Sequence, residues 1–207
     1  MPALCLGTFL VVWIMLAIAP HDRTTWALEN TPTLVGVPVA VVSFRRFRFS
    51  DRAYVRGTVL LVLHTIGSYY TYSAVPVGAW ARDAFSLERN HYDRVIHFAF
   101  GLLMLLPIRE LGFRNARPLS LAVAFFSVAG VGFWSACYEV VEWLVAITVD
   151  PAAGKAYLGT QGDVWDAEKD MAAALFGAAL AALIECRRET RASRATGERV
   201  CAGMGGR

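Results

Sequence analysis

The longest apolar stretch of the chain, residues 119–149, most restricts what the chain can fold into. It has 31 residues, most of them apolar. A helix needs about 20 such residues to cross a hydrocarbon core of about 30 Å. Two carboxylates, Glu139 and Glu142, lie within the stretch. Ionisable side chains are costly at such depth and mark candidate functional sites, so the stretch predicts a membrane helix that carries part of a site.

Six windows of the sequence are apolar enough to suggest membrane helices. They are residues 3–19, 27–44, 56–75, 94–109, 119–142 and 165–185. The hydrophobic content of 56% exceeds the roughly 45–50% that is usual for soluble domains. We therefore predict an all-α fold, a polytopic transmembrane helical bundle of about six spans. We expect a single transmembrane domain over residues 1–186, followed by a basic, disordered tail over residues 187–207.

The distribution of basic residues predicts the orientation of the bundle. Residues 45–56, residues 109–117 and the tail after residue 184 together hold 14 of the 20 Lys and Arg residues. With six spans these segments share one side of the membrane, which the positive-inside rule assigns to the cytoplasm. We predict a multi-pass protein of the cell inner (plasma) membrane with both termini in the cytoplasm. The bilayer is thus an expected partner. The net charge of +3 reports topology, so nucleic acid is not expected as a partner.

With this topology, the outer ends of the last three predicted helices carry closely spaced polar pairs. The pairs are Asp93 with His97, Glu139 with Glu142, and Asp166 with Asp170. Spacings of three or four residues place both members of a pair on one helix face. With a rise of 1.5 Å per residue, all three pairs reach a similar depth near the outer boundary of the membrane. Such a cluster could bind a divalent cation, hold a proton, or pair with nearby arginines.

We assign hypothetical catalytic and substrate-binding roles to the residues around this cluster. Acid–base catalysis is assigned to Glu139, Glu142, His97 and Asp93. Substrate contacts are assigned to Arg89, Asn90, Arg94, Tyr72, Gln161 and Trp165. Structural alternatives exist for two of the other polar residues. Asp163 would cap the last helix, and His64 would form a hydrogen bond across helices near the bilayer centre.

The same cluster suggests metal ligands. The expected ligands are Asp163, Asp166 and Asp170, joined by His97 and Glu139. Carboxylate oxygens with one imidazole suit a divalent ion such as Mg²⁺, Mn²⁺ or Zn²⁺, and the sequence does not choose among them. A divalent metal ion is therefore the cofactor to look for, although the sequence establishes none.

Four motifs, in order along the chain, resemble the YjdF-like family of bacterial inner-membrane proteins. They are HTIGSYYTYSAVPVG (residues 64–78), RNHYDRVIHF (89–98), YEVVEW (138–143) and GTQGDVWDAEKDM (159–171). The resemblance covers about residues 20–185 and implies a polytopic membrane protein whose biochemical activity is not established. The order Asp-Arg-x-x-His, later Glu, later Asp is also similar to VanZ-like membrane proteins, with Arg94 where a Lys is usual. That similarity implies a role in the envelope or in antibiotic resistance.

Three classes of function remain open. The first is an outer-face protein that binds or processes a lipid or envelope-linked substrate. The second is an ion- or proton-coupled carrier that uses Glu139, Glu142 and His64 as a relay. The third is a non-catalytic envelope accessory protein. The outer position of the cluster favours the first class, because a carrier needs polar residues through the full depth and only His64 lies deep. The sequence contains no P-loop, HExxH or nucleophile elbow, so it does not decide whether the protein is an enzyme.

Overall fold

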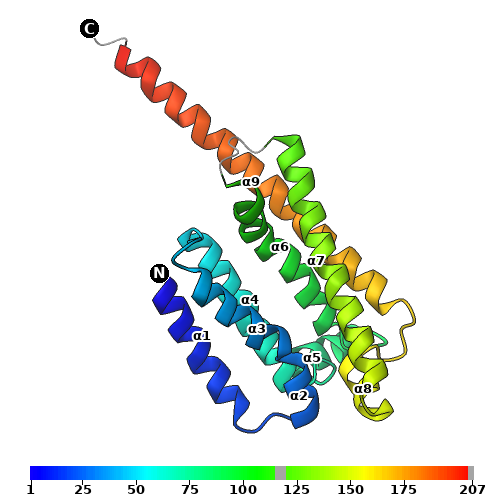
Figure 1. The fold of residues 1–207 in the computed structure, drawn as a ribbon. Coiled ribbons are helices and arrows are strands. Elements are labelled where there is room, and N and C mark those ends of the chain that lie inside the picture. The colour runs from blue at the N-terminus through cyan, green and yellow to red at the C-terminus, as the bar shows by residue number, and fades with distance from the viewer. Residues whose placement is uncertain (115–119, 205–207) are drawn as a thin grey trace.

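A computed structural model describes residues 1–114 and 120–204, with side chains placed as far as residue 192. Within these residues the chain is helical and contains no strand. The helices are α1 (Pro2–Ala17), α2 (Arg23–Glu29), α3 (Thr31–Ser43), α4 (Asp51–Tyr69), α5 (Pro76–Ala84), α6 (Tyr92–Phe113), α7 (Leu121–Thr148), α8 (Pro151–Leu158) and α9 (Asp166–Met204). The long helices run along a common direction (Figure 1). The predicted all-α helical bundle is thereby confirmed for the described residues.

Two of the described helices, α6 and α7, are long and apolar enough to cross a membrane, and α1 is apolar but shorter. Many apolar side chains of α7 are exposed, including Phe125, Phe133 and Ile147. Large apolar side chains on the outside of a helix suit contact with lipid better than contact with water. The six-span arrangement and the cytoplasmic termini stay predictions.

The predicted window 27–44 is divided at Asn30, which lies between α2 and α3. This side chain is fully buried, and its Oδ1 accepts a hydrogen bond from Trp13 Nε1 at 2.6 Å. Its Nδ2 donates to the carbonyl oxygen of Trp26 at 2.7 Å and to Ser68 Oγ at 3.3 Å. Asn30 therefore joins α1, α2 and α4 at one point. The divided helix leaves Glu29 at the end of α2, on the inside of the bundle.

The window 56–75 also ends earlier than predicted, because the chain turns sharply after Tyr69. Thr71 and Tyr72 have positive φ angles of 56° and 53°. The turn is closed by a hydrogen bond from the Tyr72 backbone N–H to the Gly67 carbonyl oxygen at 2.8 Å. A Cβ added to Gly67 would lie 2.6 Å from the Tyr72 ring, so glycine is required there. The turn directs the Tyr72 hydroxyl back along α4 toward His64.

Helices α6 and α9 approach so closely that their backbones touch. A Cβ added to Gly101 would lie 1.9 Å from the Ala174 carbonyl oxygen, and one added to Gly177 would lie 2.2 Å from that of Phe98. Small residues permit such close helix contacts in membrane proteins. The buried core beside this contact consists of Leu105, Val131, Ala174, Ala178, Ala181 and Ala182. The contact sets the distance between the polar residues at the first turns of α6 and α9.

The inner ends of the helices are joined by ion pairs. Glu185 of α9 is buried and accepts hydrogen bonds from Arg52 at 2.7 Å and Arg56 at 2.6 Å, both on α4. Arg109 of α6 contacts Glu189 of α9 at 2.8 Å. Helix α9 runs through residue 186, the predicted end of the transmembrane domain, and continues to Met204. The domain boundary itself stays a prediction.

Candidate functional site

A network of ion pairs covers the outer ends of α6 and α9. Arg94, in the first turn of α6, binds Asp163 at 2.8 Å and Asp166 at 2.9 Å. Arg89 binds Asp166 from the loop before α6, and Lys169 binds Asp163 at 2.8 Å. Three cations are thus shared by two carboxylates. We call these five residues the outer ion-pair network.

Hydrogen bonds to the backbone hold the two loops of this network together. The Gln161 side chain bonds both backbone groups of Asn90: Oε1 accepts from the N–H at 3.0 Å, and Nε2 donates to the carbonyl at 2.9 Å. Asn90 Nδ2 donates to the carbonyl oxygens of Ser73 and Val75, at 3.0 Å each. Arg89 Nη1 donates to the Thr160 carbonyl oxygen at 3.0 Å. Asn90, Gln161 and Arg89 therefore fix loops in the structure, whereas the sequence suggested substrate contacts for them.

A second group of polar side chains lies next to the outer ion-pair network, between α6, α7 and α9. The ligand atoms of Asp93, His97 and Asp170 all lie within 4.8 Å of one another. His97 Nε2 lies 3.7 Å from Asp93 Oδ1 and 3.5 Å from Glu139 Oε1. We call Asp93, His97, Glu139 and Asp170 the central cluster. These are side chains from three helices that lie up to 77 residues apart in the sequence.

Two carboxylate oxygens of the central cluster accept no hydrogen bond from the described residues. They are Asp170 Oδ1 and Glu139 Oε1. Asp170 is only 2% exposed, and the Nε atom of Arg94 approaches its Oδ1 no closer than 3.5 Å. A buried carboxylate without a partner is costly. The central cluster therefore has unsatisfied capacity to bind a proton or a cation.

Three further side chains extend the polar region away from the outer ion-pair network. Tyr138 OH donates a hydrogen bond to Glu29 Oε2 at 3.4 Å, and the rings of Tyr138 and His97 are 6.0 Å apart in an edge-on arrangement. His64 Nε2 contacts the Glu29 carbonyl oxygen at 3.0 Å, and its Nδ1 contacts Tyr72 OH at 2.5 Å. The predicted hydrogen bond of His64 across helices is therefore present.

Glu29 is the residue of this region that the sequence analysis missed. It was counted among the charges of an outer loop, yet its side chain is 3% exposed and faces Tyr138 of α7. A signal existed in the sequence, because Glu29 lies at the start of the second apolar window and Asn30-Thr-Pro32 suggests a helix break. The position of α2 against α7 and α8 could not be read from that signal.

The outer ion-pair network and the central cluster differ in electrostatics. In the network, hydrogen bonds from Lys169 and Arg94 hold the pKa of Asp163 well below its ordinary value. In the central cluster, three carboxyl groups face one imidazole and the edge of Arg94. The network is thus charge-balanced by its own cations, and the central cluster is not.

The predicted site residues fall into distinct places. Asp163 and Asp166, expected as metal ligands, bind Arg89, Arg94 and Lys169 instead. Glu142 lies on the same helix as Glu139 and beside Tyr138, and Tyr72 is buried against His64. Trp165 is exposed and contacts neither group of polar side chains in any interaction described above. The catalytic, substrate-binding and metal-binding roles of these residues stay predictions.

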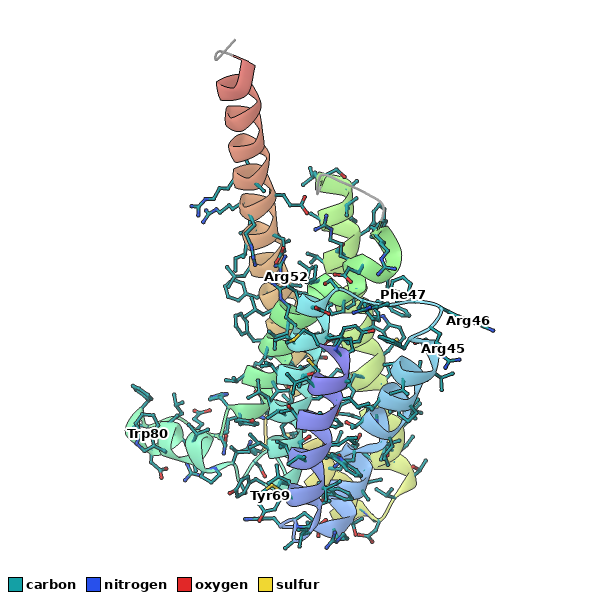
Figure 2. The ribbon with its side chains drawn as sticks, turned by 90° about the vertical axis from the view of Figure 1, so that its left-hand side faces the viewer. Arg45, Arg46, Phe47, Arg52, Tyr69 and Trp80 are labelled. Atoms are coloured by element: carbon teal, nitrogen blue, oxygen red, sulfur yellow. The ribbon has the colours of Figure 1, made fainter. Side chains whose placement is uncertain are left out.

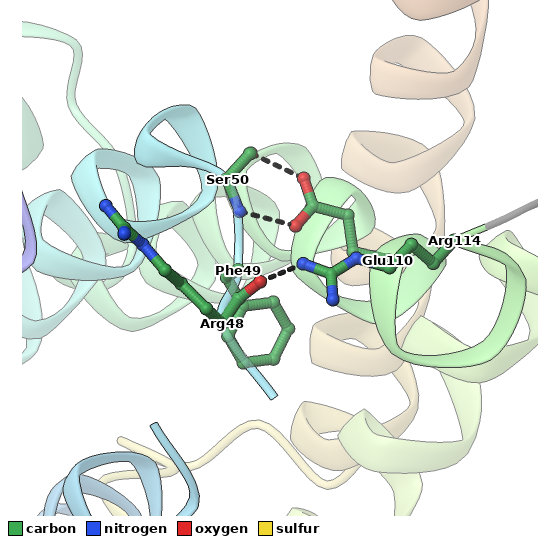
Figure 3. A pocket seen from close by; sticks show the side chains of 5 residues that line it. All are labelled: Arg48, Phe49, Ser50, Glu110 and Arg114. Atoms are coloured by element: carbon green, nitrogen blue, oxygen red, sulfur yellow. Dashed lines mark hydrogen bonds between the residues drawn. The ribbon is translucent and has the colours of Figure 1, made fainter. Parts of the chain in front are cut away.

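A separate cavity of about 430 Å³ lies at the opposite, arginine-rich end of the bundle (Figure 3). It is lined by Arg48, Phe49, Ser50, Glu110 and Arg114. Glu110 accepts hydrogen bonds from the backbone N–H of Ser50 at 2.8 Å and from its hydroxyl at 2.5 Å, and Arg114 donates to the Arg48 carbonyl oxygen. These contacts join the start of α4 to α6. The cavity contains none of the predicted site residues.

Comparison with known proteins places the chain among membrane proteins. Residues 1–191 match the model of the family described as predicted membrane protein (DUF2238). Over 172 residues the chain is 35% identical to "Inner membrane protein YjdF" of Escherichia coli (strain K12). The alignment covers 83% of this chain and 82% of that protein. No solved structure matches the chain.

Proposed function

The chain belongs to the YjdF-like, DUF2238 family of inner-membrane proteins, and from that premise we propose that its central cluster binds a divalent cation through Asp93, His97 and Asp170. The spacing of the three ligand atoms carries the proposal. Atoms that share one ion are separated by at most about twice the metal–ligand distance, roughly 4–5 Å. The ligand atoms here lie within 4.8 Å of one another.

A second observation supports the same proposal. Asp170 is 2% exposed, and its Oδ1 accepts no hydrogen bond from the described residues. Glu139 Oε1, 3.5 Å from His97 Nε2, is in the same position. A divalent cation between these groups would satisfy both oxygens and would offset the excess of carboxylates. Two or three carboxylates with one imidazole suit Mn²⁺ or Zn²⁺ better than Ca²⁺, which prefers oxygen ligands only.

We assign the bound cation a role at the outer leaflet. The helix ends that hold the cluster are the predicted outer ends, and exposed Trp165 and Trp143 are typical of a membrane interface. An ion with three or four protein ligands keeps positions open for oxygen atoms of another molecule. Phosphate oxygens of a lipid or lipid-linked envelope substrate would suit those positions. The protein would thus bind or process such a substrate at the outer face of the inner membrane.

A proton-coupled carrier is the second candidate, because one observation favours it. The contacts of Tyr138 with Glu29, and of His64 with Tyr72, continue the polar region beyond the central cluster. Buried ionisable residues in series are typical of proton relays. In that case Asp170 would hold a proton, and no cation would be required for stability.

Metal titration of the purified chain distinguishes the two candidates. After chelation, the protein in nanodiscs is titrated with Mn²⁺, and free Mn²⁺ is followed by its EPR signal. We expect one bound ion per chain, and at least tenfold weaker binding in Asp170→Asn. Glu168→Gln is the matched control, because Glu168 is an exposed carboxylate two residues away on α9. Equal binding by the parent chain and Asp170→Asn, or no binding by either, would exclude the proposed cation site.

A further inference from the structure

Helix α5 projects from the side of the bundle. Figure 2 shows Trp80 on an arm that leaves the long helices sideways, nearer to Tyr69 than to the end that carries Arg45, Arg46 and Arg52. No residue of α5 is buried. The arm is attached through its ends: Asn90 binds the Val75 carbonyl oxygen, and a Cβ added to Gly78 would meet the Asn90 side chain at 1.8 Å.

The sequence of α5 is amphipathic. Val77, Trp80 and Ala84 follow one another at spacings of three and four residues, which places them on one face. Arg82 and Asp83 lie on the other face and form an ion pair at 2.8 Å. The side chain of Val77 is 60% exposed and that of Trp80 is 65% exposed. Phe85 extends the apolar face, its ring 6.3 Å from that of Trp80. An isolated apolar face of this kind requires a covering partner.

The direction of the arm indicates what covers this face. The long helices of the family's membrane domain run along the membrane normal, so an arm that leaves them sideways lies along the membrane plane (Figure 2). It leaves at the end of the bundle that holds the central cluster, where α6 begins. Tryptophan is enriched at membrane interfaces, and short amphipathic helices lie there with their apolar face among the lipids.

A second protein chain is a poorer partner for this face. A specific protein interface buries about 800 Å² on each partner. A helix of nine residues is only about 14 Å long and offers a single apolar face, which is too small for such an interface. A bilayer sets no minimum area, because the rest of the bundle is already embedded in it.

We propose that α5 is an interfacial membrane helix. It lies in the outer leaflet beside the site, with Val77, Trp80 and Phe85 among the lipids and with Arg82 and Asp83 facing water. This inference concerns a surface outside the central cluster and does not depend on cation binding.

Spin-label accessibility tests the proposal in the full chain. In a background without the four native cysteines, nitroxides are attached at Val77→Cys, Trp80→Cys and Asp83→Cys, and the protein is reconstituted in liposomes. Collision rates are measured with oxygen, which enters lipid, and with a water-soluble nickel chelate. Two reference positions are Phe133→Cys on exposed α7 and Glu168→Cys at the outer surface.

The proposal expects the labels at positions 77 and 80 to match Phe133→Cys, with high oxygen and low nickel accessibility. The label at position 83 should match Glu168→Cys. Nickel accessibility at 77 and 80 equal to that of Glu168→Cys would place the arm in water and overturn the proposal. Spin–spin broadening at 77 and 80 that disappears on dilution with unlabelled chain would assign the face to a second copy, and would overturn it too.

A measurement without cysteine substitutions provides an independent check. Brominated lipids quench the fluorescence of tryptophans that contact the acyl chains. Their fractional quenching should fall when Trp80 alone is replaced in Trp80→Phe, because an accessible lipid-contacting fluorophore has been removed. An increase in fractional quenching would mean that Trp80 is shielded from lipid, and would contradict the proposal.

Discussion

At the residue scale, carboxylates that look alike in the sequence have opposite surroundings in the structure. Asp163 and Asp166 are each bound by two cations of the outer ion-pair network. Asp170, only four residues after Asp166, has an oxygen that accepts no hydrogen bond from the described residues. Adjacent turns of one helix therefore carry a structural ion pair and a candidate ligand. Only the second is available for binding.

The pKa of Asp163 leads to a prediction about acid stability. Its hydrogen bonds with Lys169 and Arg94 lower the folded-state pKa below the ordinary value of 3.8. A lowered pKa stabilises the fold at every pH above 3.8, and this contribution is lost as the pH falls from there through the folded-state pKa. Asp163→Asn should therefore melt below the parent chain by a constant interval between pH 7 and about pH 5, and the interval should narrow below about pH 4.

Thermal melts of both chains in one detergent, from pH 7 to pH 3, check this prediction. Glu168→Gln is the control, since Glu168 is exposed near the same helix end, and its melting temperature should stay close to that of the parent chain. An interval for Asp163→Asn that does not change between pH 7 and pH 3 would show that the Asp163 charge does not support the fold.

At the element scale, the contact between α6 and α9 determines whether the central cluster exists. Asp93 and His97 come from α6, and Asp170 comes from α9. Their ligand atoms can lie within 4.8 Å because Gly101 and Gly177 allow the two backbones to touch. Larger residues at the contact would separate the helices and, with them, the ligands.

Substitution of Gly177 tests this dependence. A methyl group at Gly177 would lie 2.2 Å from the Phe98 carbonyl oxygen, so Gly177→Ala must push the helices apart. We expect a loss of stability of about 1–3 kcal/mol, as for other overpacked interiors. Gly112→Ala on α6 is the matched control, because nothing lies within 4 Å of its added Cβ.

Thermal melts and Mn²⁺ titrations of both variants provide the two readouts. Gly177→Ala should melt lower and bind Mn²⁺ more weakly than the parent chain. Gly112→Ala should bind Mn²⁺ normally, and its stability should be unchanged or slightly raised, because alanine favours the helix over glycine by roughly 0.5–1 kcal/mol. Equal behaviour of the two variants would show that the close contact of α6 and α9 is unimportant.

At the scale of the whole molecule, the number of spans is the main open prediction. Only α6 and α7 meet the criteria of length and apolarity by themselves. Helix α4 carries His64, Thr65 and Ser68 on buried positions or toward the polar region, and α3 has 13 residues. Helices that face a polar interior need not be apolar all round. Figure 1 shows α1 beginning and α9 ending toward the same end of the bundle, as six spans require.

Reporter fusions test the six-span topology directly. Fusions after residues 50, 85, 115 and 160 should report inside, outside, inside and outside, because the arginine-rich segments remain in the cytoplasm. A fusion of each reporter to the extreme C-terminus, expected inside, controls for expression. Reversal at any one of the four positions would remove the outer-face placement of both the central cluster and α5.

Much of the element structure was predictable because it depends on local sequence. Five of the six apolar windows each correspond to one long helix, although their ends differ by several residues. The exception is the window 27–44, where Asn30 separates α2 from α3. Pro32 in the first turn of α3 is a local signal for a new helix, but the burial of Asn30 by Trp13 and Ser68 depends on distant residues.

The candidate site was predictable only in its membership. Helical spacing puts Asp93 with His97 on one face, and Asp166 with Asp170 on another. The sequence could not show which of these carboxylates would meet arginines. It also could not show that Glu29 would face Tyr138, because residues 109 positions apart were brought together by the folding of α2 against the bundle.

The sequence by itself determined the membrane class, the helical elements and the presence of buried charges, because apolar length and helical periodicity are local properties of the chain. The tertiary structure alone decided which charges are neutralised. Arg89 meets Asp166 across 77 residues, and Arg94 meets Asp163 across 69, so these cations are used before they can reach the central cluster. Electrostatic pairing depends on distances of a few ångströms between separate helices, and the contact of α6 with α9 sets those distances.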